Sequence, residues 1–598
     1  MNTGKAEFNI NRRKFLHSAA AAGAGLALSR VRSAGAKNRK KPEDVNIALL
    51  GAGSQGHRLV DMICRRNVPG IRIKAVCDIW TKFNQEKTSL LLQRYKHTHN
   101  VYEDYREMLN KEKGNFDAVI VATPDFWHSR HAVACLEAGL HVYCEAEMSN
   151  TVEGARAMVK AAKRTGKLLQ IGRQRRSNPR YIQCYNKLLK EAKLLGRITT
   201  VYGQYNRSKL ACKDRSWPDR AVIDNAKLEE YEFESMHQFR NWRWYRCKSG
   251  GPIAYRGSHQ IDIYNWFLDA NPRTVIADGG TDYWSGRESY DSVTAIYTYE
   301  TKEGTVRALY QTITTNDSDG YYEKFMGDEG TLVISQQDWR TRAERQWWVD
   351  AGKWQRWIKK GYLKYSAPAR EFSESGIEII RDPSLPSPPP TYVVPTTWQY
   401  KDYPLWHLEN FFDAIRDKAK LNCPAEVGYK TAVAVLKVNE AVEAERKLRF
   451  KPEEFVVHNP QKEMIEHVVE VKLPESVSNC RYHSKSHGMG RGTGWGFFEI
   501  SRVDLLTLLD TSDNLPDASE FGQDSHVRSD IEKYLERTGE SIAWWKPSTL
   551  RKRQYANKII GGENVTGRFE LIMLPAINIC VGEIQDDRMG VYFVYHCG

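Results

Sequence analysis

Apolar residues of the first third of the chain fall into short runs separated by amphipathic stretches. The runs are VNIALL (45–50), IKAVCD (73–78), DAVIVAT (117–123), HVYC (141–144) and LLQIG (168–172). Helical patterns such as SRHAVACLEAG and TVEGARAMVKAAKRTG separate most of them, the latter with a possible capping box at Asn150 and Glu153 and a stop at Gly166. Short apolar strands alternating with helices are typical of a parallel sheet covered on both faces. We therefore predict an α/β domain here.

The hydrophobic pattern changes near residue 198. The stretches ITTVYGQYN, SVTAIYTYE and TVRALYQTI alternate β-branched or aromatic residues with polar ones, and KEG (302–304) predicts a hairpin turn. Helical patterns return at 405–418 and 428–447, after a proline-rich stretch at 380–395 that predicts a loop. The second region is expected to be an α/β domain with an open, mainly antiparallel sheet.

The length of the chain requires several domains, because 598 residues exceed what one hydrophobic core supports. After about residue 457 the composition drifts again, with a glycine cluster GMGRGTGWG and late apolar runs FELIML, INICVGEI and GVYFVYHC. We predict a signal peptide at 1–36, a linker at 37–44, a Rossmann domain at 45–167, a substrate and oligomerisation domain at 168–457, and a C-terminal extension at 458–598.

The N-terminal segment resembles a twin-arginine export signal. Arg12 and Arg13 precede Phe15 and Leu16, a small-residue apolar run follows, and residues 34–36 (AGA) suit a cleavage site. The alternative is a basic, Ala-rich tail. The apolar run is about half the roughly 20 residues that a membrane span needs, so no integral membrane segment is expected in the mature chain. The signal predicts an exported, periplasmic protein.

The charge of the chain argues against a nucleic-acid partner. The 88 Lys and Arg exceed the 74 Asp and Glu, for a formal net charge of +14. Without residues 1–36 the counts are 82 and 73, a net +9 spread over a long chain and without a basic repeat. We expect a small-molecule partner instead.

The eleven cysteines form no framework spacing and no C-x-x-C pair. Cys480, His483 and His487 have tolerable zinc spacing but lack a clear fourth ligand. We therefore predict no metal site.

The glycine-rich stretch Gly51-Ala52-Gly53-Ser54-Gln55-Gly56 has the spacing G-x-G-x-x-G between an apolar strand and a helix. In that setting Gly51 permits a tight turn, Gly53 lets a pyrophosphate approach the backbone, and Gly56 lets helix and strand pack closely. The helix start offers free N–H groups to the phosphates. The stretch predicts a dinucleotide site that includes Ser54 and Gln55, although a strand–turn–helix without cofactor would look the same.

Asp78 identifies the cofactor more closely. It stands at the end of the second predicted strand, 22 residues after Gly56, where an acid binds the adenine ribose hydroxyls. A carboxylate there repels a 2′-phosphate, and Ile79 and Trp80 follow it instead of an arginine. The sequence therefore predicts NAD as cofactor.

The stretch GGPIAYRGSHQID (250–262) predicts a helix start with candidate chemistry. Ser258 is a plausible N-cap, which would place His259 in the first turn, where the helix dipole keeps an imidazole neutral and able to act as a base. Asp262 lies at i+3 and could bind substrate or orient the ring. The alternative is a capped helix in which His259 only satisfies a turn.

These motifs together resemble the glucose–fructose oxidoreductase/inositol dehydrogenase (Gfo/Idh/MocA) family. The resemblance rests on GAGSQG, Asp78, ATPDFWHSRHAVACLEAGLHVYCEAEMSNTVEGARAMV (122–159) and G-S-H-x-x-D, and it covers about residues 45–457. It implies a Rossmann domain followed by an α/β domain, NAD(P)-dependent action on sugars or cyclitols, and a homo-oligomer. Some family members are exported by twin-arginine signals.

The resemblance also implies roles for single residues. Thr123 and Pro124 match the turn near the nicotinamide, His128 matches the family's T-P-x-x-x-H histidine, and Glu145 matches the acid of E-K-P. The lysine of that motif is replaced by Ala146 and the proline by Glu147. In D-x-G-x-H-x-x-D the family positions match at Gly257, His259 and Asp262, while Tyr255 stands at the first aspartate.

The missing lysine requires another group to hold the substrate oxygen. Tyr255, Arg256, Arg173 and Arg175 are the candidates, and we predict replacement by the Tyr255–Arg256 pair. An arginine can clamp and polarise an oxygen but cannot serve as base. Flat aromatic faces suit sugar rings, so Trp242 and Trp244 of NWRWY (241–245) are further candidates for substrate contact.

Three functions remain open from the sequence. The first is an NAD-dependent oxidoreductase that acts on a secondary alcohol of a sugar, cyclitol or glycoside by hydride transfer, with His259 as base. The second is a redox-neutral glycoside-cleaving enzyme, in which oxidation, elimination and reduction follow one another. The third is a non-catalytic NAD-binding or scaffold protein, motivated by Ala146 and Tyr255.

Overall fold

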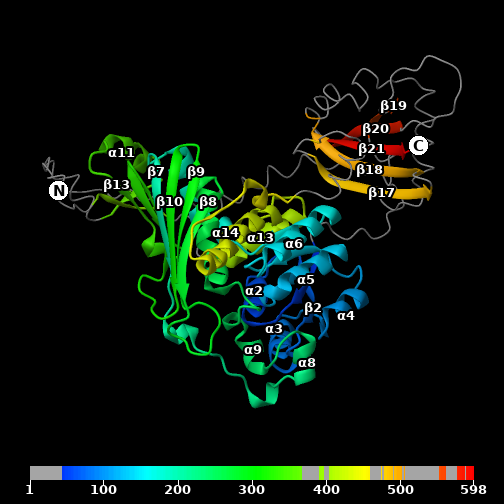
Figure 1. Ribbon diagram of the computed structural model, residues 1–598, viewed down its shortest axis with the longest axis horizontal. Helices are drawn as coiled ribbons and strands as arrows, with labels where there is room; N and C mark the ends of the chain where they lie inside the picture. The colour runs from blue at the N-terminus through cyan, green and yellow to red at the C-terminus, as the bar shows by residue number, and fades with distance from the viewer. Residues whose placement is uncertain are drawn as a thin grey trace, which may run out of the picture. The chain divides into compact units, whose positions relative to one another are not determined.

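The computed structural model describes residues 44–366, 389–395 and 403–457, the single residues Leu473, Val477 and Asp504, and the backbone of strands between 478 and 597. The predicted signal peptide at 1–36 and nearly all of the predicted linker lie outside the described residues. Figure 1 shows the arrangement of the elements in the described part of the chain.

The first sheet is parallel and has the order β3-β2-β1-β4-β5-β6. Its strands are β1 (Val45–Leu50), β2 (Ile71–Cys77), β3 (Asn100–Tyr102), β4 (Ala118–Val121), β5 (His141–Cys144) and β6 (Leu169–Ile171). Five of these strands were expected. The short β3, which is mostly exposed, had no apolar run to reveal it. Strand order reverses between β1 and β4, and in such sheets ligands bind beyond the carboxyl ends of the strands at that point.

Helices cover both faces of this sheet, as the pattern predicts. They are α2 (Ser54–Arg65), α3 (Glu86–Arg94), α4 (Tyr105–Lys111), α5 (Asp125–Glu137) and α6 (Val152–Thr165). One cap was predicted wrongly. Thr151, and not Asn150, caps α6 by accepting from the Gly154 N–H, because its backbone is extended where the helix begins. Gly166 ends that helix at φ +65°, as predicted.

The second sheet is mixed and mostly antiparallel, which agrees with the predicted open sheet. Its order is β14-β15-β13-β12-β11-β7-β10-β9-β8-β16, and only β7 (Ile198–Tyr205) and β10 (Gly304–Ile313) pair in parallel among its described strands. Lys302 and Glu303 form the turn between β9 (Ser292–Thr301) and β10, as KEG predicts. The remaining strands are β8 (Pro272–Gly280), β11 (Tyr321–Gly327), β12 (Gly330–Ile334), β13 (Arg342–Arg345), β14 (Lys364–Tyr365), β15 (Thr391–Val393) and β16 (Leu448–Arg449).

The proline-rich stretch is not only a loop. Residues 391–393 form β15, which pairs with β13 and β14, and Tyr392 is buried against Trp354 of α11 (Ala351–Lys359). The preceding prolines up to residue 388 lie outside the described residues. The prediction of a loop missed β15 because its three residues carry no alternation long enough to stand out.

Two late helices pack against the first domain, and one of them also contacts the second sheet (Figure 1). Helix α14 (Ala425–Ala444) contacts β8, α6 and α10 (Ser258–Leu268). Helix α13 (Tyr403–Ile415) contributes Leu405, Leu408, Phe411 and Phe412 to the same buried cluster as β1 and α2. The first domain therefore completes its core with residues from near the end of the second.

Residues 206–248, here called the cap segment, lie over the carboxyl ends of the first sheet. They hold three 3-10 turns (Lys209–Cys212, Asp219–Ala221, Trp242–Trp244) and two short helices, α8 (Asn225–Glu230) and α9 (Met236–Arg240). The indole N–H of Trp80 donates to the Ala221 carbonyl and that of Trp127 to the Tyr231 carbonyl (3.3 Å). A shared apolar cluster of both regions buries these indoles.

The C-terminal region contains a five-stranded antiparallel sheet in the order β17-β18-β21-β20-β19. The strands are β17 (Ser478–Gly488), β18 (Arg491–Ser501), β19 (Arg551–Ile559), β20 (Ala576–Gln585) and β21 (Arg588–Cys597). The runs INICVGEI and GVYFVYHC form β20 and β21, while FELIML and the side chains of Cys480, His483 and His487 lie outside the described residues. Within the described part of the chain, no helix is long and apolar enough to cross a bilayer.

Candidate functional site

A cavity of about 640 Å³ opens between the carboxyl ends of the first sheet and the cap segment. One wall comes from the turns after β1, β2 and β4. The other comes from β7, the cap segment and the helical run before α10. The lining includes most of the predicted cofactor residues and four of the predicted substrate or catalytic ones: Gly51, Gly53, Ser54, Gln55, Asp78, Thr123, Pro124, Trp242, Trp244, Tyr255 and Arg256.

The glycine turn has the geometry that a dinucleotide site requires. Gly51 has φ +94°, and a Cβ there would meet the Ala122 carbonyl carbon at 2.7 Å. A Cβ on Gly56 would lie 1.9 Å from the Gly51 oxygen, so helix and strand pack too closely for any side chain. At Gly53 the nearest atom to such a Cβ would be Asn84 Nδ2 at 3.8 Å, which leaves room for a pyrophosphate. No side chain caps the start of α2, so its first N–H groups keep no side-chain partner and are available to a phosphate.

Asp78 is held at the edge of this cavity by the backbone. The Ala52 N–H donates to Oδ2 (2.7 Å), the Trp80 N–H donates to Oδ1 (2.8 Å), and Asn84 Nδ2 donates to Oδ2 (3.3 Å). Burial raises the pKa of Asp78 to about 6, against these hydrogen bonds, which lower it. A carboxylate fixed beside the glycine turn fits the two hydroxyls of an adenine ribose.

Two further predicted cofactor residues lie behind the cavity wall. Glu145 accepts from Gln55 Nε2 (3.0 Å) and from Gln174, and it thereby ties the glycine turn to the end of β5. The His128 ring lies between the carbonyl oxygens of Thr123 and Glu147, each 2.7 Å from a ring nitrogen. Burial lowers the pKa of His128 to about 4, so the ring is neutral and donates to one of these carbonyls. Both residues support the cofactor turns and do not line the cavity.

The opposite wall centres on Tyr255, whose hydroxyl is buried without a hydrogen-bond partner. The Arg256 guanidinium lies 5.1 Å and the Arg243 guanidinium 5.6 Å from the centre of its ring. Burial raises the pKa of Tyr255, while Arg256 and Arg243 lower it, so the hydroxyl keeps its proton at neutral pH. A buried hydroxyl without a partner in a cavity wall is a group available to a ligand.

His259 follows Tyr255 by four residues on one continuous helical run. The π-helical turn η7 (Ile253–Gly257) continues directly into α10, and Gly257 has helical φ and ψ angles of −61° and −29°. The prediction that Ser258 caps this helix is therefore wrong, because the helix has already begun. The Ser258 hydroxyl instead accepts from Arg173 Nη1 (2.5 Å). Tyr255 and His259 lie on about the same face of the run.

The His259 ring is neutral, as predicted, but for a different reason. Burial lowers its pKa well below 6.5, and the charges of Arg175 and Arg173 lower it further. A helix dipole is not the cause, since the helix start lies farther back along the chain. His259 is half-buried and lies outside the cavity lining.

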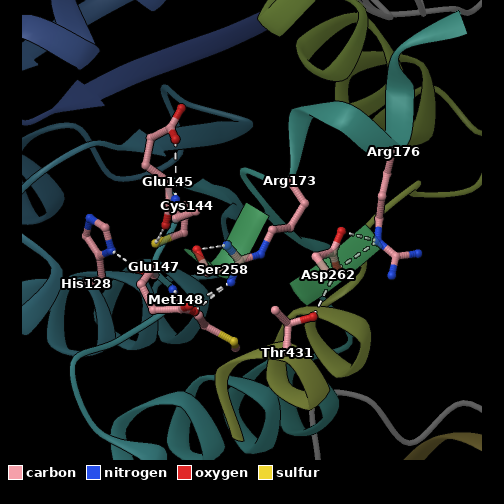
Figure 2. A network of polar contacts seen from close by, with 11 residues as sticks. His128, Cys144, Glu145, Glu147, Met148, Arg173, Arg176, Ser258, Asp262 and Thr431 are labelled. Atoms are coloured by element: carbon pink, nitrogen blue, oxygen red, sulfur yellow. Dashed lines mark hydrogen bonds and ion pairs between the residues drawn. The ribbon is translucent and has the colours of Figure 1, made fainter. Parts of the chain in front are cut away.

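Arg173, Arg175 and Arg176 each form an ion pair with a buried carboxylate. Figure 2 shows the pairs of Arg173 and Arg176. Arg173 Nη2 contacts both oxygens of Glu147 at 2.8 Å, and Arg175 pairs with Glu323. Arg176 Nε contacts both oxygens of Asp262 at 3.0 and 2.8 Å, and the Thr431 hydroxyl donates to Asp262 as well (2.9 Å). The predicted substrate ligands Arg173 and Arg175 and the predicted catalytic Asp262 therefore lie in internal ion pairs and do not line the cavity.

Comparison with known proteins places both domains in one family. The NAD-binding Rossmann fold of an oxidoreductase family matches residues 45–173, and the C-terminal α/β domain of the same family matches residues 222–449, together more than half of the chain. The chain belongs to the Gfo/Idh/MocA family. Residues 45–173 accordingly form an NAD-binding domain, and the glycine turn and Asp78 described above fit that cofactor.

Two curated relatives of this Gfo/Idh/MocA protein match part of its length. "Glycosyl hydrolase family 109 protein 1" of Shewanella sp. (strain ANA-3) is 30% identical over 179 residues, which is 27% of this chain and 38% of the relative. "4-Carboxy-2-hydroxymuconate-6-semialdehyde dehydrogenase" of Sphingobium sp. (strain NBRC 103272 / SYK-6) is 28% identical over 184 residues, 30% of this chain and 56% of the relative. The matched stretch thus spans about half or less of these relatives.

A similar solved structure is "Levoglucosan dehydrogenase, complex with NADH". It is 18% identical, covers 68% of this chain and 99% of its own, and has a TM-score of 0.49.

The departures from the Gfo/Idh/MocA motif lie together in the structure. Ala146 offers no side-chain cation where the resemblance implies a lysine. The next residue, Glu147, replaces the proline and is completely buried against Arg173. Arg173 in turn holds Ser258, the residue before His259. The altered motif is therefore connected by hydrogen bonds to the helical run that carries Tyr255 and His259 (Figure 2).

Sequence reasoning missed several residues of this Gfo/Idh/MocA site. Arg243 lies between the two tryptophans of NWRWY, where only the aromatic residues were considered. Trp80 and Asn84 flank Asp78. The cap segment adds four more cations to the lining: Arg207, Lys213, Arg215 and Arg240. Their only signal was a high density of basic residues in 207–246, which looks the same in a solvated loop.

Proposed function

We propose that the protein is an NAD-dependent oxidoreductase that acts on a secondary alcohol of a sugar, cyclitol or glycoside. The observation that supports it best is the unpartnered Tyr255 hydroxyl in the same cavity as the glycine turn and Asp78. NAD, when bound, supplies the hydride acceptor. The chain itself must hold the alcohol oxygen, accept its proton and exclude water.

In this proposal Tyr255 performs the role that the resemblance assigns to the missing lysine. Its protonated hydroxyl donates a hydrogen bond to the substrate oxygen, and Arg256 and Arg243 beside its ring favour negative charge developing on that oxygen. His259 lies one turn further along the helical run, outside the cavity lining, and as a neutral imidazole it is the group proposed to receive the proton behind Tyr255. Trp242 and Trp244 line the cavity as flat contacts for a sugar ring.

Purified protein tests this function directly. Its NAD content is measured first by mass spectrometry after denaturation. Protein that holds NAD is then offered a panel of neutral and acidic sugars, cyclitols and glycosides, and NADH absorbance is followed. Reduction of NAD by one class of alcohol is expected. Silence across the panel in NAD-loaded protein would count against the proposal.

A redox-neutral glycoside-cleaving reaction is the second candidate, and the cap segment favours it. Trp80 and Trp127 bind the cap segment over the carboxyl ends of the first sheet, where it would partly cover a cofactor in the cavity and slow its release between turnovers. The similarity to a glycosyl hydrolase is consistent with this reading. Cleaved glycoside detected by mass spectrometry without accumulating NADH would select it over net oxidation.

We also propose export to the periplasm, on the resemblance of residues 1–36 to a twin-arginine signal. The test replaces Arg12 and Arg13 with lysine and compares the protein content of the periplasmic and cytoplasmic fractions. The unchanged chain should appear in the periplasm and the double variant in the cytoplasm. Equal distribution of the unchanged chain and the double variant would show that residues 1–36 do not act as a twin-arginine signal.

A further inference from the structure

The cavity carries far more positive than negative charge. Its lining holds two acidic residues, Asp78 and Glu103, and seven basic ones: Arg58, Arg207, Lys213, Arg215, Arg240, Arg243 and Arg256. Asp78 is occupied by backbone N–H groups and Asn84, and Glu103 pairs with Lys227 outside the lining (3.1 Å). Among the described residues, none of the seven cations forms an ion pair with a carboxylate. The excess is therefore not compensated within this part of the chain.

Two of these cations lie around the reactive end of the cavity, Arg256 buried and Arg243 half-buried. Arg256 is 8% exposed and reaches only neutral acceptors, Cys212 Sγ (3.0 Å) and the Ile313 carbonyl (3.4 Å). Arg243 lies over the Trp242 ring (4.2 Å), and its guanidinium makes no hydrogen bond to any described residue. Both flank the Tyr255 ring.

The nearest acid does not neutralise this pair. Asp125 acts on Arg243 through space, but its buried carboxyl oxygens lie outside ion-pair distance of that guanidinium. Burial raises the pKa of Asp125 to about 7, so it is only partly ionised at neutral pH. Removing cations from water without a matched anion is costly, and proteins normally supply a partner. The pyrophosphate of NAD is provided for at Gly53 and the start of α2, so it does not explain cations at Tyr255.

We propose that the substrate carries an anionic group that Arg243 and Arg256 hold beside Tyr255. This inference rests on the proposed function and names its substrate class: an acidic sugar or glycoside with a carboxylate, phosphate or sulfate substituent. The planar guanidinium fork bonds two oxygens of any of these groups, and Arg243 has its whole fork free. The remaining lining cations raise the local concentration of such a ligand before it meets the pair.

The experiment compares substrates that differ only in charge. Methyl glucuronide is measured against methyl glucoside, with glucose 6-phosphate and glucose 6-sulfate against glucose, in NAD-loaded protein at low and moderate salt. Equilibrium binding is measured by calorimetry, and turnover is followed by NADH and by product mass. We expect the preferred acidic probe to bind about tenfold or more tightly than its neutral partner, with the preference falling as salt rises.

Single substitutions then locate the preference. Arg243→Gln and Arg256→Gln should each weaken binding of the acidic probe by about ten- to a hundredfold and change binding of the neutral probe by less than about threefold. Arg246→Gln is the control. Arg246 belongs to the cap segment, pairs with Glu443 and lies outside the cavity lining, so it should leave the preference intact. The pattern across the carboxylate, phosphate and sulfate probes identifies which anion the pair takes.

The outcomes separate the substrate class from the reaction. Turnover of neutral and acidic probes at equal kcat/KM, with equal binding, would overturn the anionic substrate while the oxidoreductase function stands. Charge-selective binding that is lost in Arg243→Gln, but without NAD reduction or bond cleavage, would support the anionic ligand and overturn the proposed reaction. Binding without charge preference would overturn the inference whatever the turnover.

Discussion

Two groups of arginines in this protein differ in whether a carboxylate neutralises their charge. Arg173, Arg175 and Arg176 follow one another just after β6, and each meets a buried carboxylate: Glu147, Glu323 or Asp262. Arg243 and Arg256 flank Tyr255 in the cavity and meet none among the described residues. The first group uses its cations to fix the fold around the helical run of His259. The second leaves its cations available to a ligand.

The comparison teaches that burial alone does not identify a functional arginine. Arg173 and Arg175 are 1% and 2% exposed and Arg256 is 8% exposed, so accessibility barely separates them. What separates them is the partner. The charge of Arg173 is neutralised by a bidentate carboxylate of the same chain. Arg256 reaches only a thiol and a carbonyl, so it still lacks an anionic partner.

The largest expected effect comes from removing a carboxylate of the first group. Glu147→Gln leaves the Arg173 charge buried without its partner, which should lower the free energy of unfolding by about 3–5 kcal/mol. Denaturant unfolding, followed by far-UV circular dichroism, measures it. Glu300→Gln is the control, because its pair with Arg273 is exposed and should be worth about 1 kcal/mol or less. Equal losses of stability in both variants would mean that the buried ion pair stabilises the fold no more than an exposed one.

The second prediction concerns the group that replaces the lysine. Tyr255→Phe should lower kcat about a hundredfold, the effect of losing one donor to a developing oxyanion, with NAD affinity unchanged. Stability should not fall, since the lost hydroxyl has no partner in the protein. Ala146→Lys should add little activity. If Ala146→Lys raised turnover by orders of magnitude while Tyr255→Phe changed nothing, the site would be a degenerate one and a binding role would replace the catalytic one.

The third prediction concerns Asp78, whose carboxylate accepts hydrogen bonds from N–H groups and has no cationic partner among the described residues. The pKa of Asp78 is about 6, and its ionised form is the better acceptor for ribose hydroxyls. NAD affinity should therefore be constant above about pH 7 and fall by up to about tenfold per pH unit below pH 6. Titration of cofactor-free protein with NAD at several pH values measures this. Asp78→Asn should bind more weakly at pH 8 and lose this pH dependence; an unchanged pH profile in the variant would assign the dependence to another group.

The smallest expected effect is a change in the free energy of unfolding, and its direction distinguishes the two groups of arginines. Arg243→Gln removes a cation without a carboxylate partner, so the free energy of unfolding without ligand should stay within about 1 kcal/mol of the parent protein or rise. Arg176→Gln strands Asp262 and should lower it clearly. Thermal unfolding of both variants, side by side and without added anions, provides the measurement. A marked loss in Arg243→Gln would mean that this arginine, too, is part of the structural framework.

The sequence predicted the cofactor wall better than the substrate wall, for a physical reason. The glycine turn, Asp78, Thr123 and Pro124 act through backbone geometry at strand ends, and that geometry is determined over a few neighbouring residues. The roles of Arg173, Arg175 and Asp262 depend on partners 26 to 169 positions away, which spacing does not reveal. Arg243 was overlooked for the same reason, since its distinction is the lack of a partner.

Reliance on local sequence patterns also limited the prediction of helices and strands. Alternation identified β9, β10 and the turn between them, and amphipathic runs identified α13 and α14. The three-residue strands β3 and β15 were missed because they are defined by their neighbours in the sheet. Ser258 has the chemistry of a cap, but the π-helical turn before it had already started the helix.

The contribution of α13 to the first domain has a consequence for synthesis of the chain. The apolar surface of β1 and α2 is complete only when Leu405, Leu408, Phe411 and Phe412 arrive, more than 230 residues after β6 has left the ribosome. Until then the nascent first domain displays uncovered hydrocarbon to the cytosol, where chaperones bind such surfaces. A stop codon placed just before residue 403 should therefore yield aggregated or degraded polypeptide, and not a soluble NAD-binding fragment.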